Sequence, residues 1–211
     1  ATFMCRPHSP NTFASGWHLH QSLIDSKTGK NAFIPGTQDD CLSDIGKAYL
    51  SGLLEHASAS CILAAPTINA YKRYRPQTLA PDRIQWGRDN KGAMLRVLGG
   101  MGDPATRIEN RVGEPAANPY LYIASQVLSG LAGIHQRYPL PAPVEEPYNT
   151  TAQRLPRSLF QALLYFQESA FYREQFGDNF VNYYATIKQA ELDRFLSEVT
   201  DWEQKEYFEM F

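Results

Sequence analysis

The five residues 107–111, RIENR, place charged side chains at every second position. Successive side chains of a β-strand point to opposite faces, so Arg107, Glu109 and Arg111 would share one face of a strand. Two guanidinium groups beside one carboxylate could form a solvated ladder of charge. They could also form the wall of a site that handles a metal ion and phosphate, and the motif alone leaves both possibilities open.

A second alternating motif, SGWHLHQSL, spans residues 15–23. His18 and His20 are two residues apart on a predicted strand, so their rings point the same way. Two imidazoles on one face can ligate a metal or contact phosphate at neutral pH, although an isolated pair is more often a polar strand surface. Glu109 shifts this balance, because with His18 it offers an oxygen and a nitrogen ligand for Mg²⁺ or Mn²⁺.

Arginines are concentrated between residues 73 and 111, where the sequence has Arg73, Arg75, Arg83, Arg88, Arg96, Arg107 and Arg111. Arginine is favoured where carboxylate or phosphate must be bound through two parallel hydrogen bonds. Most charge clusters are simply solvated faces. Here three separate segments each set an arginine beside apolar residues, which favours a concave, anion-binding wall.

These residues need strands to position them, and the sequence of the first half of the chain predicts such strands. In the sheet-rich residues 1–113, alternating segments at 17–23, 83–88, 93–99 and 106–112 are separated by loops rich in Gly, Pro and Asn. This arrangement favours antiparallel strands. One helix at about 40–64 interrupts them, opening at Asp39-Asp40 and ending at Pro66.

The second half, residues 114–211, is predicted to be helical. One helix includes Leu121 to Ile134 and begins near Pro119, where a missing N–H does no harm. A Pro-rich linker, YPLPAPVEEP, separates it from helical segments at 158–169, around 179–199 and at 201–211. The predicted fold class is therefore α+β, an antiparallel β-sheet with helices packed over one face.

Composition excludes several classes of protein. The chain has 211 residues and a net charge of −2, with no basic run that would attract nucleic acid. Three cysteines without a CxxC pair indicate reduced thiols in a cytoplasmic protein. No apolar run reaches the roughly 20 residues of a membrane span. The start, ATFM, lies inside a predicted strand and suggests a piece of a longer protein.

Five motifs occur in one order: SGWHLHQSL, NAYKRYRP, LRV, RIENRV and PAANPY. In this order and spacing the chain resembles the C-terminal catalytic region of glutamine synthetase, from Phe3 to about residue 136. The ending DWEQKEYFEMF is similar to the tail of the same family. The resemblance implies the glutamine synthetase/guanido kinase-like fold. It also implies an ATP-dependent ligase that joins ammonia or an amine to the γ-carboxyl of glutamate, or of a related acid, through a γ-glutamyl phosphate.

The resemblance also implies roles for individual residues. His18 and Glu109 would ligate the metal beside the ATP phosphates, which is Mg²⁺ or Mn²⁺. The residues implied for nucleotide contact are His20, Ser22, Lys91, Arg96 and Arg107. Arg73 and Arg111 would hold the carboxylates of glutamate, and the catalytic residues would be Arg96, which stabilises the transferring phosphoryl group, and Arg111. By this resemblance, RIENR is the wall of a site.

The chain departs from the family pattern at three places. Ammonia-using members carry PGYEAP after YKR, and its glutamate helps to deprotonate ammonium. Here the segment is PQTLAP, with Leu79 at the glutamate position. This resembles the branch that ligates larger amines to glutamate. An Asn-Gly pair that helps to bind glutamate is replaced by Phe13-Ala14, and an arginine that contacts phosphate by Lys91, which lacks the bidentate fork.

The alternative to an enzyme is a catalytically inactive member with a structural or regulatory role. Loss of ligation should erode the metal and phosphate residues together, yet His18, Glu109, Arg96, Arg107 and Arg111 all remain. In the family, an N-terminal domain and the carboxylates of the first metal lie upstream of the matching region. We therefore expect these 211 residues alone to be inactive, and the full-length protein to form a ring-shaped homo-oligomer.

Overall fold

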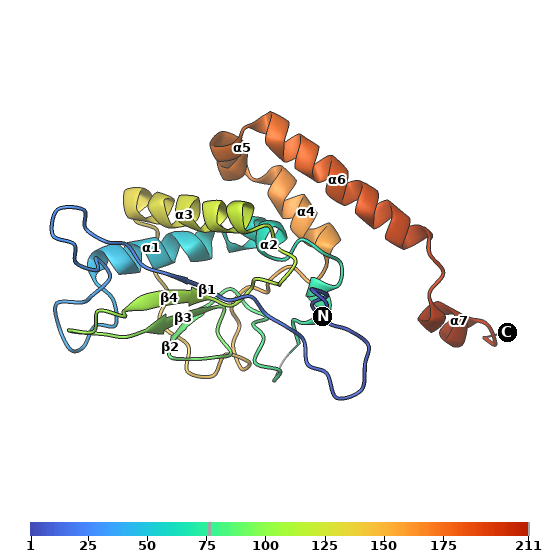
Figure 1. Cartoon of the computed structure of the whole chain (residues 1–211), viewed down its shortest axis with the longest axis horizontal. Coiled ribbons are helices and arrows are strands. Elements are labelled where there is room, and N and C mark those ends of the chain that lie inside the picture. The colour runs from blue at the N-terminus through green and yellow to red at the C-terminus, as the bar shows by residue number, and fades with distance from the viewer. Residues whose placement is uncertain (76, 211) are drawn as a thin grey trace.

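A computed structural model of the chain describes residues 1–75 and 77–210. Pro76 of the PQTLAP segment and Phe211 of the C-terminal motif lie outside the described residues. The fold is α+β, as expected: a sheet in the order β1-β4-β3-β2 with helices α1 and α3 over one face (Figure 1). The strands are β1 (Leu19–Gln21), β2 (Trp86–Arg88), β3 (Leu95–Leu98) and β4 (Arg107–Asn110).

The sheet is mixed, and the expectation of a purely antiparallel sheet was wrong for one pair of strands. β4 is antiparallel to both β1 and β3, but β2 and β3 run parallel, with Trp86 opposite Leu95. A strand of three residues is only about 10 Å long. Residues 89–94 connect β2 to β3, and Asp89 among them has a φ of 45°. These six residues are therefore long enough to bring the chain back to the start of β2, so that β3 runs beside it in the same direction. Side-chain alternation is the same in both directions and could not reveal this.

The helix expected at 40–64 is two helices, α1 (Asp44–Glu55) and α2 (Ala57–Ala64). Ser43 caps the start, accepting a hydrogen bond from the amide of Gly46, so the helix begins after the expected Asp39-Asp40. His56 interrupts the helical backbone, with φ −95° and ψ 10°. Its ring stacks on the ring of Phe171, with 3.8 Å between the centroids, so this break lies against a helix from the second half of the chain.

Helix α3 (Pro119–Gln136) packs along α1, as Figure 1 shows. Asn118 caps it and Pro119 occupies its first turn. The two helices meet at glycines: a Cβ atom on Gly52 would lie 2.0 Å from the carbonyl oxygen of Ser129 and 2.6 Å from the amide nitrogen of Gly133. Only glycine allows this approach, which sets α3 directly against α1 above the sheet.

The remaining helices are the 3-10 helix η1 (Ala70–Lys72), which leads into Arg73, and four in the second half of the chain: α4 (Leu159–Glu168), α5 (Ala170–Phe176), α6 (Asp178–Ser197) and α7 (Asp201–Tyr207). Sequence patterns did not indicate α5 as a separate helix. α7 stands apart from the rest of the chain in Figure 1 and has no buried residue.

Two further expectations concern the whole chain. In residues 1–75 and 77–210, no helix is both long and apolar enough to cross a membrane. Cys5, Cys41 and Cys61 are free thiols, as the cysteine pattern predicted.

Candidate active site

Three strands bring charged side chains to one face of the sheet. Glu109 on β4 is paired with His20 on β1 and with Arg96 on β3. Directly opposite residues of antiparallel strands project from the same face, so a carboxylate, an imidazole and a guanidinium converge there. The two histidines and the RIENR motif therefore share a face, as their alternation predicted.

Glu109 is the centre of this cluster, and its side chain is only 2% exposed. One oxygen, Oε1, accepts hydrogen bonds from His18 Nδ1 at 2.8 Å and from Arg111 Nη1 at 2.7 Å. The other, Oε2, accepts from Arg96 Nη1 at 3.0 Å. Burial alone would raise the pKa of this carboxyl, but the His18 and Arg96 hydrogen bonds and the charge of Arg111 lower the pKa to about 2. Glu109 is thus an ionised, fixed anion between cations.

Arg73 holds His18 from the other side of the ring. Its Nη2 lies 3.3 Å from His18 Nε2 and 2.9 Å from the Arg111 carbonyl oxygen, to which it donates. Its Nη1 donates to the carbonyl oxygens of Val112 and Gly113. Because Nε2 accepts from Arg73, the proton of a neutral His18 sits on Nδ1, facing Glu109. Arg73 thus fixes the end of β4 and the orientation of the imidazole.

Gly16 makes this contact possible. A Cβ atom at this position would lie 2.5 Å from Arg73 Nη2 and 2.7 Å from His18 Nε2. Any larger residue would have to displace the arginine or the histidine.

Of the residues expected to contact nucleotide, Arg96, His20 and Arg107 lie at the cluster. Arg107 Nε donates to His20 Nδ1 at 3.0 Å. Burial lowers the pKa of His20, the Glu109 carboxylate partly opposes this, and Arg107 adds to the lowering. Ser22, beyond the end of β1, and Lys91, in the loop between β2 and β3, are exposed to solvent.

The expected arginine wall forms only in part. Arg73, Arg96, Arg107 and Arg111 gather at the cluster, as described above. Three others do not belong to it: Arg83 donates to the carbonyl of Ala152, Arg88 donates to the carbonyl of Asp39, and Arg75 lines a different pocket with Arg154 and Arg157. The concentration of arginines between residues 73 and 111 therefore overstated how many of them lie in the site.

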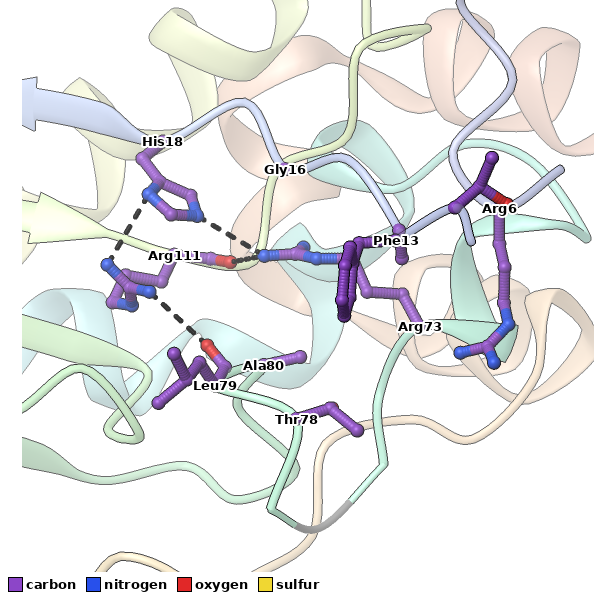
Figure 2. A pocket seen from close by; sticks show the side chains of 11 residues that line it. Arg6, Phe13, Gly16, His18, Arg73, Thr78, Leu79, Ala80 and Arg111 are labelled. Atoms are coloured by element: carbon purple, nitrogen blue, oxygen red, sulfur yellow. Dashed lines mark hydrogen bonds between the residues drawn. The ribbon is translucent and has the colours of Figure 1, made fainter. Parts of the chain in front are cut away.

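A pocket of about 450 Å³ opens beside His18, Arg73 and Arg111 (Figure 2). Its other wall includes Phe13 and Leu79, which come from the segment before β1 and from the loop after η1. Leu79 has a φ of 57°, a conformation that few non-glycine residues adopt. Arg111 Nη2 donates to its carbonyl oxygen at 3.2 Å, so the arginine beside Glu109 also holds this loop.

Three residues of the site were not singled out from the sequence. Gly16 and Arg6 line the pocket. Asp89 accepts a hydrogen bond from Arg96 Nε at 2.9 Å and a second one from its Nη2. The position of Gly16, two residues before His18, was the only available signal.

Whether a metal ion can bind here depends on the donor atoms that the site offers. His18 Nδ1 and Glu109 Oε1 face each other at 2.8 Å, so a nitrogen and a carboxylate oxygen lie side by side, but Nδ1 would have to give up its proton to ligate a metal. Within residues 1–75 and 77–210, no group of three or more His, Cys, Asp or Glu side chains is arranged to hold a metal. Mg²⁺ commonly takes one or two protein carboxylates and fills other positions with water or phosphate oxygens. The pair fits part of such a site and needs further ligands.

The fold and the site define an α+β domain with an arginine-lined face suited to anionic substrates. The chain belongs to the glutamine synthetase family: residues 1–207 match the family's catalytic domain.

Individual relatives extend this match. A γ-glutamylanilide synthase from Acinetobacter sp. is 46% identical to the chain and aligns with all of it, but with only 44% of its own length. A γ-glutamylethanolamide synthetase of Streptomyces coelicolor is 38% identical over 91% of the chain. A solved structure of GmaS without ligand has a TM-score of 0.85 at 28% identity, covering 99% of the chain and 48% of GmaS. The chain thus spans about half the length of these relatives.

Proposed function

We propose that the full-length protein is an ATP-dependent ligase that joins an amine to the γ-carboxyl group of glutamate. The observation that supports this most directly is the convergence of Arg96, Arg111 and His18 on the buried carboxylate of Glu109. Family membership implies ATP and a divalent metal. The relatives named above are synthetases, which supports an enzyme over the inactive alternative.

In the proposed reaction, the γ-carboxylate of glutamate first attacks the γ-phosphorus of ATP, and ADP leaves. Such a transfer mainly requires alignment and positive charge around the moving group. Arg96 stabilises that group, and Arg111 holds substrate carboxylate. Arg111 Nε is a buried donor with no partner among the described residues. Arg73 keeps His18 and β4 in place and lines the same pocket.

The amine then attacks the acyl carbon of γ-glutamyl phosphate. A carbon–nitrogen bond forms, the carbon–oxygen bond to phosphate breaks, and the amine nitrogen releases a proton to solvent. Leu79 stands in the loop that faces this step and cannot take that proton. We therefore propose an organic amine, rather than ammonia, as the preferred nucleophile.

His18 and Glu109 would hold the divalent metal, Mg²⁺ or Mn²⁺, together with ligands outside residues 1–211. The bound ion would supply positive charge beside the phosphates of ATP. His20, Ser22, Lys91 and Arg107 would contact the nucleotide. Residues 1–211 expressed alone should show no ligation, because only part of this donor set is present.

The assembly and cellular location are also proposals. We propose a homo-oligomeric ring that acts in the cytoplasm. Light scattering on the full-length protein tests the first, and a single subunit as the only species would contradict it. Cell fractionation tests the second.

The activity itself is tested with full-length protein, ATP, glutamate and a panel of amines. Phosphate release should require both glutamate and amine, and the γ-glutamyl amide should appear by mass spectrometry. Glu109→Gln should abolish both signals. Absence of product with every amine and with ammonia would overturn the proposal.

A further inference from the structure

Arg6 brings a third arginine, besides Arg73 and Arg111, to the pocket of about 450 Å³. Figure 2 shows Arg6 on one side of this pocket, with His18 and Arg111 on the other. The proposed function places glutamate here, and glutamate has a carboxylate at each end. Guanidinium groups on opposite sides of the pocket match that pattern of charge.

The protein itself engages most of the donors of Arg73. A guanidinium has five N–H groups. In Arg73, Nη1 donates to the carbonyl oxygens of Val112 and Gly113, while Nη2 contacts the carbonyl oxygen of Arg111 and His18 Nε2. These four hydrogen bonds leave at most the N–H group on Nε for a substrate. Arg73 is thus placed to position its neighbours rather than to clamp a carboxylate with two parallel bonds.

Arg111 lies at the reacting end of the pocket. Its Nη1 donates to Glu109 Oε1 at 2.7 Å, and its Nη2 donates to the carbonyl oxygen of Leu79 at 3.2 Å. Glu109 is the proposed ligand of the metal beside the ATP phosphates. A substrate carboxylate held by Arg111 is therefore the γ-carboxylate, which receives the phosphoryl group, and the α-carboxylate lies toward the other side of the pocket.

The structure holds Arg6 in place at its backbone and at its side chain. Its amide donates to Asn69 Oδ1 at 2.7 Å, and its carbonyl oxygen accepts from Asn69 Nδ2 at 3.1 Å. The preceding Cys5 is bonded reciprocally to Ser15, at 2.8 and 3.1 Å. The half-buried guanidinium donates from Nη1 to the carbonyl oxygen of Lys72 at 3.3 Å. A side chain that is already ordered loses little conformational entropy when a ligand binds.

We infer that Arg6 is a specificity-determining residue, which binds the α-carboxylate of the acid substrate while Arg111 binds the γ-carboxylate. This rests on the proposed function. The arginine fork suits a carboxylate, and a charge-assisted pair of this kind is among the stronger hydrogen bonds in proteins. An acid without the α-carboxylate would desolvate Arg6 and give it no anionic partner, so the site would reject it.

The experiment compares glutamate with its α-amide, isoglutamine, in the full-length protein with ATP and the amine that gives the fastest ligation. The two acids have the same shape, but the α-amide lacks the negative charge that Arg6 would bind. Wild type should show a kcat/KM about 30-fold higher for glutamate, the effect of leaving a charged partner unpaired.

Two variants then test the arginine. Arg6→Gln should raise the KM of glutamate about 30-fold, because the charged pair is lost, and change kcat less than threefold. Its constants for the α-amide, and the KM of ATP and of the amine, should stay within twofold, so the preference for glutamate disappears. Arg6→Lys keeps the charge without the fork and should fall between. Arg88→Gln is the control, because Arg88 lies outside the pocket and donates to the Asp39 carbonyl, and it should leave every constant unchanged.

The outcomes separate this inference from the proposed function. Equal losses for glutamate and the α-amide in Arg6→Gln would show that Arg6 acts only on the structure, and this overturns the inference. A KM of glutamate within twofold of wild type also overturns it, as does a wild type that does not distinguish the two acids, and each of these leaves the ligase intact. No ligation with any amine overturns the proposed function and, with it, the inference.

Discussion

Arg111 donates one hydrogen bond to the Glu109 carboxylate at 2.7 Å and another to the main-chain carbonyl of Leu79 at 3.2 Å. One guanidinium therefore joins the proposed metal-binding carboxylate to the loop of the proposed amine site. A planar, five-donor fork can serve both partners, and a single ammonium cannot.

Arg111→Lys should consequently impair both ends of this connection. We expect kcat/KM for ligation to fall about 100-fold, the effect of losing one aligned donor in an active site. Amide hydrogen exchange in the peptide covering residues 77–82 should become faster. Arg88→Lys is the matched control, since Arg88 lies outside the site and its side chain donates to the Asp39 carbonyl. Unchanged exchange in Arg111→Lys would show that the loop is held by other contacts.

Glu109→Gln should change the dependence of stability on pH. The folded pKa of Glu109, about 2, is below the usual 4.5, so its charge stabilises the fold above pH 4.5 and this contribution is lost as pH falls toward 2. At pH 7 the variant should be less stable by about 3 kcal/mol, because Arg96 and Arg111 lose a buried partner. Urea titrations of both proteins from pH 7 to pH 3 provide the difference, which should shrink below pH 4.5. A difference that grows on acidification would contradict the assigned direction.

Gly16→Ala should displace the Arg73–His18 pair. The added Cβ would meet nitrogens at 2.5 and 2.7 Å, so we expect a loss of about 1–3 kcal/mol in stability and weaker Mn²⁺ binding by the full-length protein. Gly36→Ala is the control, because nothing lies within 4 Å of its added Cβ atom. Chemical denaturation and Mn²⁺ titration by electron paramagnetic resonance measure the two effects. Equal behaviour of the two variants would rule out the tight packing described for Gly16.

Gly52→Ala tests the fold independently of the site. Its Cβ would lie 2.0 Å from the Ser129 carbonyl oxygen, and backbone atoms can yield only if α3 moves away from α1. We expect destabilisation by about 3 kcal/mol, at the upper end of overpacking effects. Thermal unfolding measures it, again against Gly36→Ala. A Tm equal to that of wild type would contradict the close packing of α1 against α3 at Gly52.

Leu79→Glu should move the preference of the full-length protein toward ammonia. The carboxylate can hold ammonium and accept a proton, while apolar amine surface loses contact worth roughly 25 cal/mol per Å². The ratio of kcat/KM for ammonia to that for an organic amine should rise at least tenfold. Leu79→Gln introduces a side chain with the shape of glutamate but without its charge, and it should not produce the rise. If wild type already prefers ammonia to every amine, a residue outside this chain supplies the base.

The sequence by itself determined which side chains share a face. In RIENR and WHLHQSL the backbone period of two places Glu109 with both flanking arginines and His18 with His20, whatever the strands pair with. The helix from Pro119 could likewise be predicted, because its cap and first-turn proline are local signals. The motif order was also sufficient to indicate the family, which the match over residues 1–207 confirmed.

Only the tertiary structure decided which of these faces meet, and which arginines join them. Arg75, Arg83 and Arg88 have the same residue type as Arg96, yet Arg75 and Arg83 lie outside the four strands, Arg88 ends β2, and none of the three joins the cluster. The parallel pairing of β2 and β3, the break at His56 and the bond from Arg111 to Leu79 also escaped prediction. Each depends on partners distant in the chain, whereas alternation and capping are set by backbone geometry within a few residues.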